Sequence, residues 1–240
     1  LKRYEAERLT ASRHIAYQDI NDLIRKSDIS IYGLESLARA DAFHSIGLTT
    51  RQALWEIKKL ACQQSSGLPL FLYAEQSYKT IMPEELKTSL PIASLGNLVA
   101  QDYLATGLSL KAHPVTMLEP YFLVDGWHPC SIAIDIMDGK KHQLIGLVTG
   151  RQMPGTAKGT VFITLEDAHY SLNVIVWPAI VRAYRAALLG SHLLGVSGRI
   201  QKQGKIIHLI ADKLVNCDLY LQYLKTPELK MPVLKSRNFH

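Results

Sequence analysis

The sequence predicts an α+β protein in which a helical N-terminal part precedes a small closed β-barrel. Two observations lead to this prediction. The segment 142–214 contains five strand-length runs, in which apolar and polar side chains alternate, and one helical run. The segment 1–60 instead spaces its apolar side chains at helical intervals, as short amphipathic helices do.

The runs in the second half follow one another in the order strand, strand, strand, helix, strand, strand. They cover 142–151, Thr160–Asp167, Ser171–Trp177, the helix Pro178–Leu189, and a hairpin of Leu193–Ile200 with Ile206–Leu214. This is the order of the OB fold, a five-stranded barrel that holds oligonucleotides on its second and third strands and on two loops.

Composition divides the chain into four parts. We expect a helical, helix-hairpin-helix-like module over 1–61, a connector over 62–139, the OB-fold barrel over 140–217 and a tail over 218–240. Helical runs in the module cover Tyr4–His14, Asp19–Lys26, Ile31–Ala42 and Arg51–Ala61, and either Thr49 or Thr50 can cap the last one. A plain helical bundle fits the same pattern. The connector is rich in Pro, Gly and Ser and contains one amphipathic helix, Leu95–Thr106.

Positive charge is concentrated in the predicted barrel. Between Lys140 and Cys217 ten Lys and Arg face three Asp and Glu, a net charge of +7, whereas the whole chain carries +6. The middle segment 61–139 is acidic, with three basic and eight acidic residues. A basic barrel of this topology favours a single-stranded nucleic acid as partner.

The predicted second strand separates core from surface. Val161, Ile163 and Leu165 alternate with Phe162, so Phe162 is expected on the outer face as a platform for base stacking. Cations flank the two loops that an OB fold uses for binding and are expected to contact phosphates without reading sequence; they are Arg151, Lys158, Arg199, Lys202 and Lys205. Trp177 precedes a proline and is either part of this surface or part of the core.

Several classes of function find no support in the sequence. It contains no apolar run of membrane-spanning length and no signal peptide, and its three widely spaced cysteines suit a reducing cytoplasm. It has no Gly-rich phosphate loop, no Ser/His/Asp signature and no Cys-x-x-Cys pair. We therefore expect no catalytic residue, metal site or cofactor in this chain, and we interpret His113, His128 and His142 as structural.

A short apolar peptide stands out in the connector. Leu68, Pro69, Leu70 and Phe71 form the kind of extended segment that docks into a groove on a partner protein, but packing of Leu70 and Phe71 on the chain's own core is the favoured interpretation.

Several segments resemble the C-family error-prone DNA polymerases of bacteria, relatives of the polymerase III alpha subunit. The resemblance spans nearly the whole chain. It is carried by 147–159 with 162–167, by 37–55, by 102–114, which includes Lys111-Ala112-His113-Pro114, and by the final residues 236–240. Thr50 stands where the family often has Arg, and Asn238 where it usually has Asp.

The resemblance implies that this chain is the C-terminal, DNA-handling part of a translesion polymerase. Damage-induced mutagenesis, template single-stranded or primer-template DNA and accessory mutagenesis proteins would follow, with Mg²⁺ bound only by a catalytic region upstream. Relatives carry a sliding-clamp peptide between the helical module and the OB fold, but 68–71 departs from its form, so weak or absent clamp binding is expected. Three alternatives remain open: a stand-alone OB-fold accessory protein for single strands, a tRNA anticodon-binding fragment, and a decayed polymerase remnant.

Overall fold

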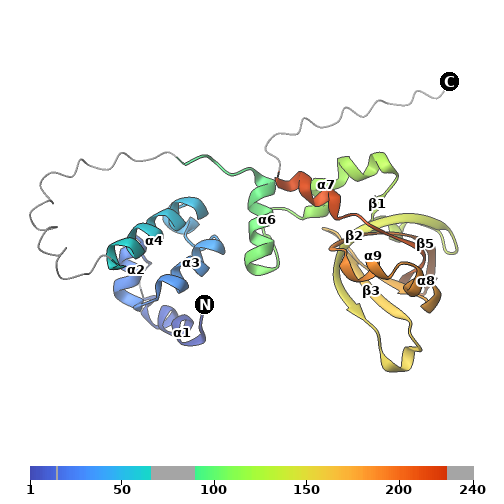
Figure 1. The fold of residues 1–240 in the computed structure, drawn as a ribbon, viewed down its shortest axis with the longest axis horizontal. Helices are drawn as coiled ribbons and strands as arrows, with labels where there is room; N and C mark the ends of the chain where they lie inside the picture. Colours follow the sequence, from blue (N-terminus) through green and yellow to red (C-terminus); the bar gives the residue numbers. More distant parts are fainter. Residues whose placement is uncertain (15, 66–89, 226–240) are drawn as a thin grey trace, which may run out of the picture. The chain divides into compact units, whose positions relative to one another are not determined.

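The computed structural model describes residues 1–14, 16–65 and 90–225. The chain divides into two compact units, one comprising Leu1–Ala93 and Gln101–Leu108, the other comprising Ser94–Ala100 and Ser109–His240. The helices of the first unit enclose one hydrophobic core, and the barrel of the second unit encloses another (Figure 1).

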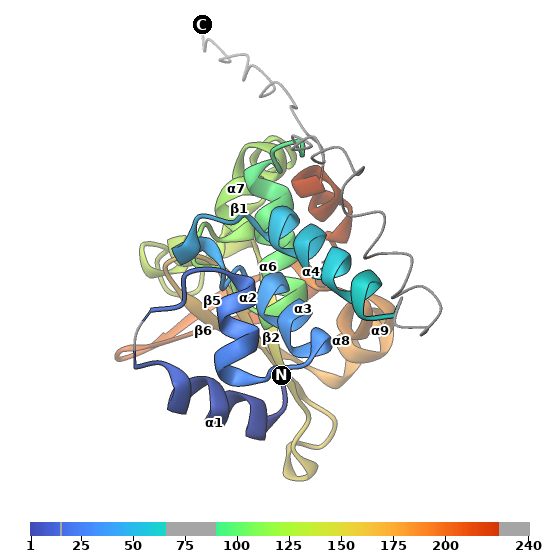
Figure 2. The same ribbon diagram turned by 90° about the vertical axis from the view of Figure 1, so that its left-hand side faces the viewer.

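The first unit is a bundle of short helices, as the sequence predicted. They are α1 (Arg3–Ser12), α2 (Ile20–Ser27), α3 (Ile31–Arg39), the 3-10 turn η1 (His44–Ile46) and α4 (Thr50–Ser65). Thr49 rather than Thr50 caps α4, because its hydroxyl accepts from Gln52 N and the Gln52 side chain accepts from Thr49 N. Figure 2 shows α3 and α4, which pack against each other.

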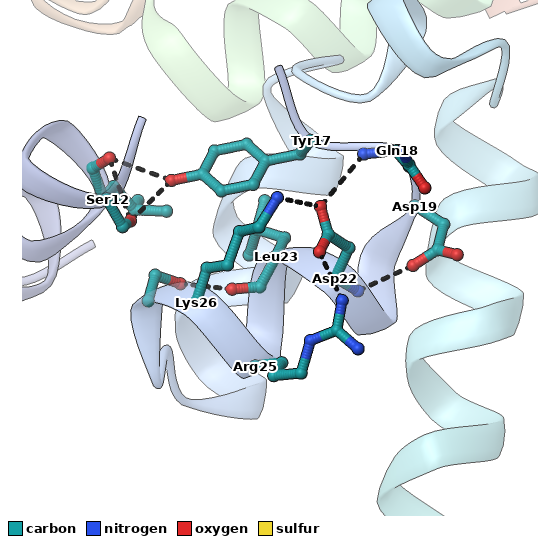
Figure 3. A network of polar contacts seen from close by, with 10 residues as sticks. Ser12, Tyr17, Gln18, Asp19, Asp22, Leu23, Arg25 and Lys26 are labelled. Carbon is teal, nitrogen blue, oxygen red and sulfur yellow. Dashed lines mark hydrogen bonds and ion pairs between the residues drawn. The ribbon is translucent and has the colours of Figure 1, made fainter. Parts of the chain in front are cut away.

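A charged network holds the start of α2 in place (Figure 3). The Asp22 carboxylate lies 2.7 Å from both Lys26 Nζ and Arg25 Nη2, and it also accepts from Gln18 N. The hydrogen bond from Lys26, and then that from Arg25, lowers the pKa of Asp22 to about 2. The carboxylate therefore stays ionised at every physiological pH and ties the preceding chain to the helix.

The second unit contains the OB barrel. Its strands are β2 (Lys141–Gln152), β3 (Val161–Glu166), β4 (Ser171–Val176), β5 (Leu193–Gln203) and β6 (Ile206–Asn216). They pair in the order β2, β3, β4, β6, β5, and β5 pairs with β2 to close the barrel. The β4–β6 pair is parallel and the other pairs within the barrel are antiparallel. This is the predicted OB order, and a short sixth strand, β1 (His128–Pro129), pairs in parallel with β2.

Two helices replace the single one predicted over Pro178–Leu189. The chain forms α8 (Pro178–Ala183) and α9 (Arg185–Gly190), and Tyr184 between them leaves helical geometry at φ −119°, ψ 29°. Ile180 and Val181 of α8 and the buried Leu188 of α9 all pack on the barrel core. The apolar periodicity persists through the break, which is why the sequence predicted a continuous helix.

A third core joins the segment before the barrel to the segment after it. It packs α7 (Pro114–Phe122) against the 3-10 helix η5 (Asp218–Lys225), with Phe122, Trp127 and Leu193 buried among them. The helix α6 (Leu95–Thr106) and the 3-10 segments η2 (Leu123–Asp125) and η3 (Cys130–Ile134) complete the described elements before the barrel. Among the described residues, no helix combines the length and the apolar composition that a membrane span requires.

One buried carboxylate fixes the turn between β3 and β4. Asp167 accepts hydrogen bonds from the backbone N–H groups of His169 and Tyr170 in the turn, at 2.8 and 2.9 Å. It also accepts from Ser131 N of η3 at 2.6 Å. Burial alone would raise the pKa of Asp167, but the backbone hydrogen bonds outweigh it and the pKa is lowered. The ionised carboxylate thus attaches η3 to the barrel.

We predict that Asp167→Ala lowers the free energy of unfolding by about 1–3 kcal/mol, because buried backbone donors lose their acceptor. Asp167→Asn is the matched control, since its amide oxygen still accepts and it should cost less. The free energy of unfolding of the wild type should exceed that of Asp167→Asn by its full amount above about pH 4, the pKa of an Asp in the unfolded chain. The difference should vanish as the pH falls through the lower pKa of Asp167 in the folded protein. Urea unfolding at several pH values measures both effects, and equal stability of wild type and Asp167→Ala would contradict the assignment.

Candidate nucleic-acid interface

The outer face of β3 and β4 presents an aromatic ring to solvent. Val161, Ile163 and Leu165 point into the barrel and are buried, whereas Phe162 between them is 37% exposed. Its partner across the strand pair is Ile175 of β4, so the two side chains stand next to each other on the outside.

A shallow groove surrounds this pair. It has a volume of about 400 Å³, and it is lined by Phe162, Ile175, Trp177, Pro178, Thr160 and the loop residues Thr156, Ala157 and Lys158. Trp177 follows β4 directly and is 51% exposed, so it belongs to the surface and not to the core. Two exposed aromatic rings beside one lysine form a surface that accepts a flat, partly apolar, anionic ligand.

The loop that carries Lys158 is tightly wound. It contains a 3-10 turn, η4 (Gly155–Ala157), and hydrogen bonds from Ala157 N to Pro154 O and from Thr160 N to Ala157 O. Lys158 adopts a left-handed conformation with φ 47°, which costs a non-glycine residue about 1–2 kcal/mol. The conformation holds an exposed cation at the rim of the groove.

The five predicted cations divide into two groups. Lys158, Arg199, Lys205 and Arg151 are all exposed, but for the first three no hydrogen bond or ion pair involves the charged group within the part of the chain that the structure describes. Lys202 instead donates its Nζ to Ile134 O at 2.6 Å, and Arg151 donates its guanidinium to Leu188 O and Ser191 O. The sequence does not reveal these acceptors, because they are backbone carbonyls from distant segments.

The strand register extends the aromatic surface toward a second cation. Phe162 pairs with Ile175, Ile175 with Ile210 on β6, and Ile210 with Arg199 on β5. Strands lie about 4.8 Å apart, so the three steps of this row span roughly 14 Å of backbone from Phe162 to Arg199 around the barrel. Lys141 of β2 is the cross-strand neighbour of Arg199. It forms an ion pair with Asp212, with Nζ 2.7 Å from Oδ2. Sequence reasoning missed Ile175 and Ile210, since only the β4–β6 pairing brings them into one row.

The three histidines that the sequence analysis interpreted as structural make the following contacts. His113 caps α7, because its Nδ1 accepts from Val115 N at 3.2 Å, and this leaves the ring proton on Nε2. Burial lowers the pKa of His113, although the nearby Glu166 carboxylate opposes the shift. His128 and His142 meet edge to face with ring centroids 4.9 Å apart. No group of three or more His, Cys, Asp or Glu among the described residues is arranged to hold a metal ion.

The remaining predicted site lies outside the described residues. Leu68, Leu70 and Phe71, the proposed partner peptide, all fall between residues 65 and 90. Among the described residues, the candidate interface is made of residues of the barrel and its connecting segments.

Sequence comparison finds extended similarity to one group of curated proteins. The chain is 37% identical over 214 residues to error-prone DNA polymerase 2 of Agrobacterium fabrum, a match that covers 88% of this chain and 19% of that protein. It is 35% identical to error-prone DNA polymerase 3 of the same organism over 98% of its length, covering 22% of that protein. Error-prone DNA polymerase 1 of Rhizobium meliloti is 40% identical over 89% of this chain and 19% of its own length. The chain thus spans about a fifth of the length of the curated relatives it matches. No protein-family model matches the chain.

Structural comparison returns proteins of low identity. Asparaginyl-tRNA synthetase from Pyrococcus horikoshii, complexed with asparaginyl-adenylate, aligns at 21% identity over 38% of this chain and 22% of that chain, with a TM-score of 0.32. The hypothetical protein ygiW from E. coli aligns at 12% identity over 37% of this chain and 86% of its own, with a TM-score of 0.29.

Proposed function

Because the chain is a homologue of the error-prone DNA polymerases and corresponds to about a fifth of their length, we propose that it is a DNA-handling part of such an enzyme. In this proposal the OB barrel binds the template as a single strand and without sequence preference. Translesion synthesis would be the activity of the whole polymerase, and the magnesium-dependent chemistry would belong to its other parts.

The groove at Phe162 and Trp177 is the observation that carries the proposal. Bases stack on exposed aromatic rings with about 1–3 kcal/mol each, whatever their identity, because every base has a π-face. Lys158 at the rim and Arg199 along the row supply positive charge for the phosphates. A barrel with a net charge of +7 adds a field that attracts a polyanion before contact.

Duplex DNA fits this surface less well. Its bases are stacked on one another and present only their edges in the grooves. The rings of Phe162 and Trp177 would therefore find no exposed base face on which to stack. A single strand can turn its bases outward at little cost. We therefore expect the chain to prefer single-stranded DNA, in keeping with a role at the template ahead of a primer end.

We predict that binding to single-stranded DNA weakens steeply with salt, with a log–log slope of about −0.7 for each phosphate neutralised. Lys158→Gly should make the slope shallower by about 0.7 and leave the free energy of unfolding unchanged or higher, because glycine tolerates the left-handed backbone there. Fluorescence anisotropy with a short oligothymidylate over a range of salt measures the slope. Affinity that does not change with salt, or tighter binding to duplex, would rule out the proposal.

The aromatic residues provide a separate test. Phe162→Ala and Trp177→Ala should each reduce affinity by about 1–3 kcal/mol while the barrel stays folded, since both rings are largely outside the core. Trp55→Ala is the matched control, because Trp55 is 57% exposed, lies on α4 of the first unit and is not one of the residues that line the groove. Anisotropy and thermal melting together decide the outcome. A collapse in melting temperature for Phe162→Ala would mean that the ring supports the fold.

A further inference from the structure

We propose that Arg151 is a positioning residue of the interface and not a phosphate contact. Its guanidinium holds the end of β2, which leads into the Lys158 loop, against α8 and α9, which follow Trp177. In this way it sets the shape of the groove. The proposal rests on the proposed function where it is tested by DNA affinity. Its second test, by the resonance of Trp177 and amide exchange, needs no DNA.

The register of β2 places Arg151, an exposed residue at the end of the strand, on the same face of the sheet as the buried Ile163. Val148 pairs with the buried Leu165, and unbroken alternation from Val148 would place residue 151 on the outside. A β-bulge between Val148 and Gly150 shifts the phase by one residue. Arg151 then pairs with Ile163, which is buried, and Gln152 pairs with the outward Phe162.

The guanidinium meets the end of α9. Its Nε donates to Leu188 O at 2.6 Å and its Nη2 donates to Ser191 O. The last carbonyls of a helix have no partners within the helix and carry partial negative charge, so a cation is stabilised there. The planar guanidinium offers two donors in fixed directions, which an ammonium group does not. Both hydrogen bonds together fix the direction of the side chain.

These bonds connect the two walls of the groove. One wall is the loop that follows Gln152, and its Gly159 lies against Pro178, where an added methyl group would be 3.7 Å from the Pro178 ring. The other wall is Trp177, from which α8 and α9 continue. Trp177 precedes α8 and α9, and Arg151 anchors the start of the loop to the end of α9.

The salt dependence of binding distinguishes a positioning residue from a phosphate contact. We expect Arg151→Ala and Arg151→Lys each to weaken oligothymidylate binding by about tenfold and to leave the log–log salt slope unchanged. Neither side chain can donate to both Leu188 O and Ser191 O in the way the guanidinium does. If Arg151 instead contacted a phosphate, the two variants would differ from each other. Arg151→Lys would then bind like the wild type, and Arg151→Ala would lower the slope by about 0.7, as Lys158→Gly does. Either of these results would overturn the proposal.

A second readout needs no DNA. In the full chain without ligand, the indole N–H resonance of Trp177 and the amide exchange rates of residues 156–160 should change in Arg151→Lys and Arg151→Ala. The matched control Arg199→Lys should leave both signals as they are in the wild type. Unchanged resonances and exchange rates in both Arg151 variants would overturn the positioning role, whether or not the chain binds DNA.

The two readouts also separate this proposal from the proposed function. If the wild type binds no DNA while these signals shift, the proposed function fails and the role of Arg151 stands. Should Arg151→Ala fail to fold, Arg151→Lys alone supplies both readouts.

Discussion

The barrel depends on β2 pairing with two neighbours at once. Its first half pairs with β5 and its second half with β3, so the strand must bend sharply to close the sheet. Two features make the bend possible. Gly146 lies beside Leu147, where β2 changes its pairing partner, and a methyl group at Gly146 would be 3.0 Å from Leu165 Cβ. The bulge between Val148 and Gly150 bends the strand further along. Closure removes the exposed strand edges that would otherwise invite aggregation.

The interface follows from the same bend. After the bulge the strand end carries the loop over the start of β3, where Phe162 points outward, and toward Trp177 at the end of β4. Helices α8 and α9 pack on the barrel core, and Arg151 connects the strand to them. An aromatic groove on a rigid support loses little conformational entropy when it binds a flexible strand. In the proposed function, stacking and phosphate contacts would provide most of the affinity.

Alternation and turn residues were sufficient to predict the strand order and the outward direction of Phe162. The sequence could not reveal the bulge, because one unpaired residue leaves no mark in the hydrophobic pattern, and the direction of Arg151 depends on it. The partners of Lys202 were equally hidden, since Ile134 O belongs to a segment 68 residues away. The break at Tyr184 was also missed, because apolar residues continue at helical spacing on both sides of it.

Cross-linking locates the bound strand most directly. Ultraviolet irradiation of the chain with a single-stranded oligothymidylate, followed by mass spectrometry of the peptides, identifies the residues that touch the bases. We predict cross-links at Phe162 and Trp177, the two exposed rings of the groove. Cross-links confined to the helices of the first unit, with none in the barrel, would contradict it.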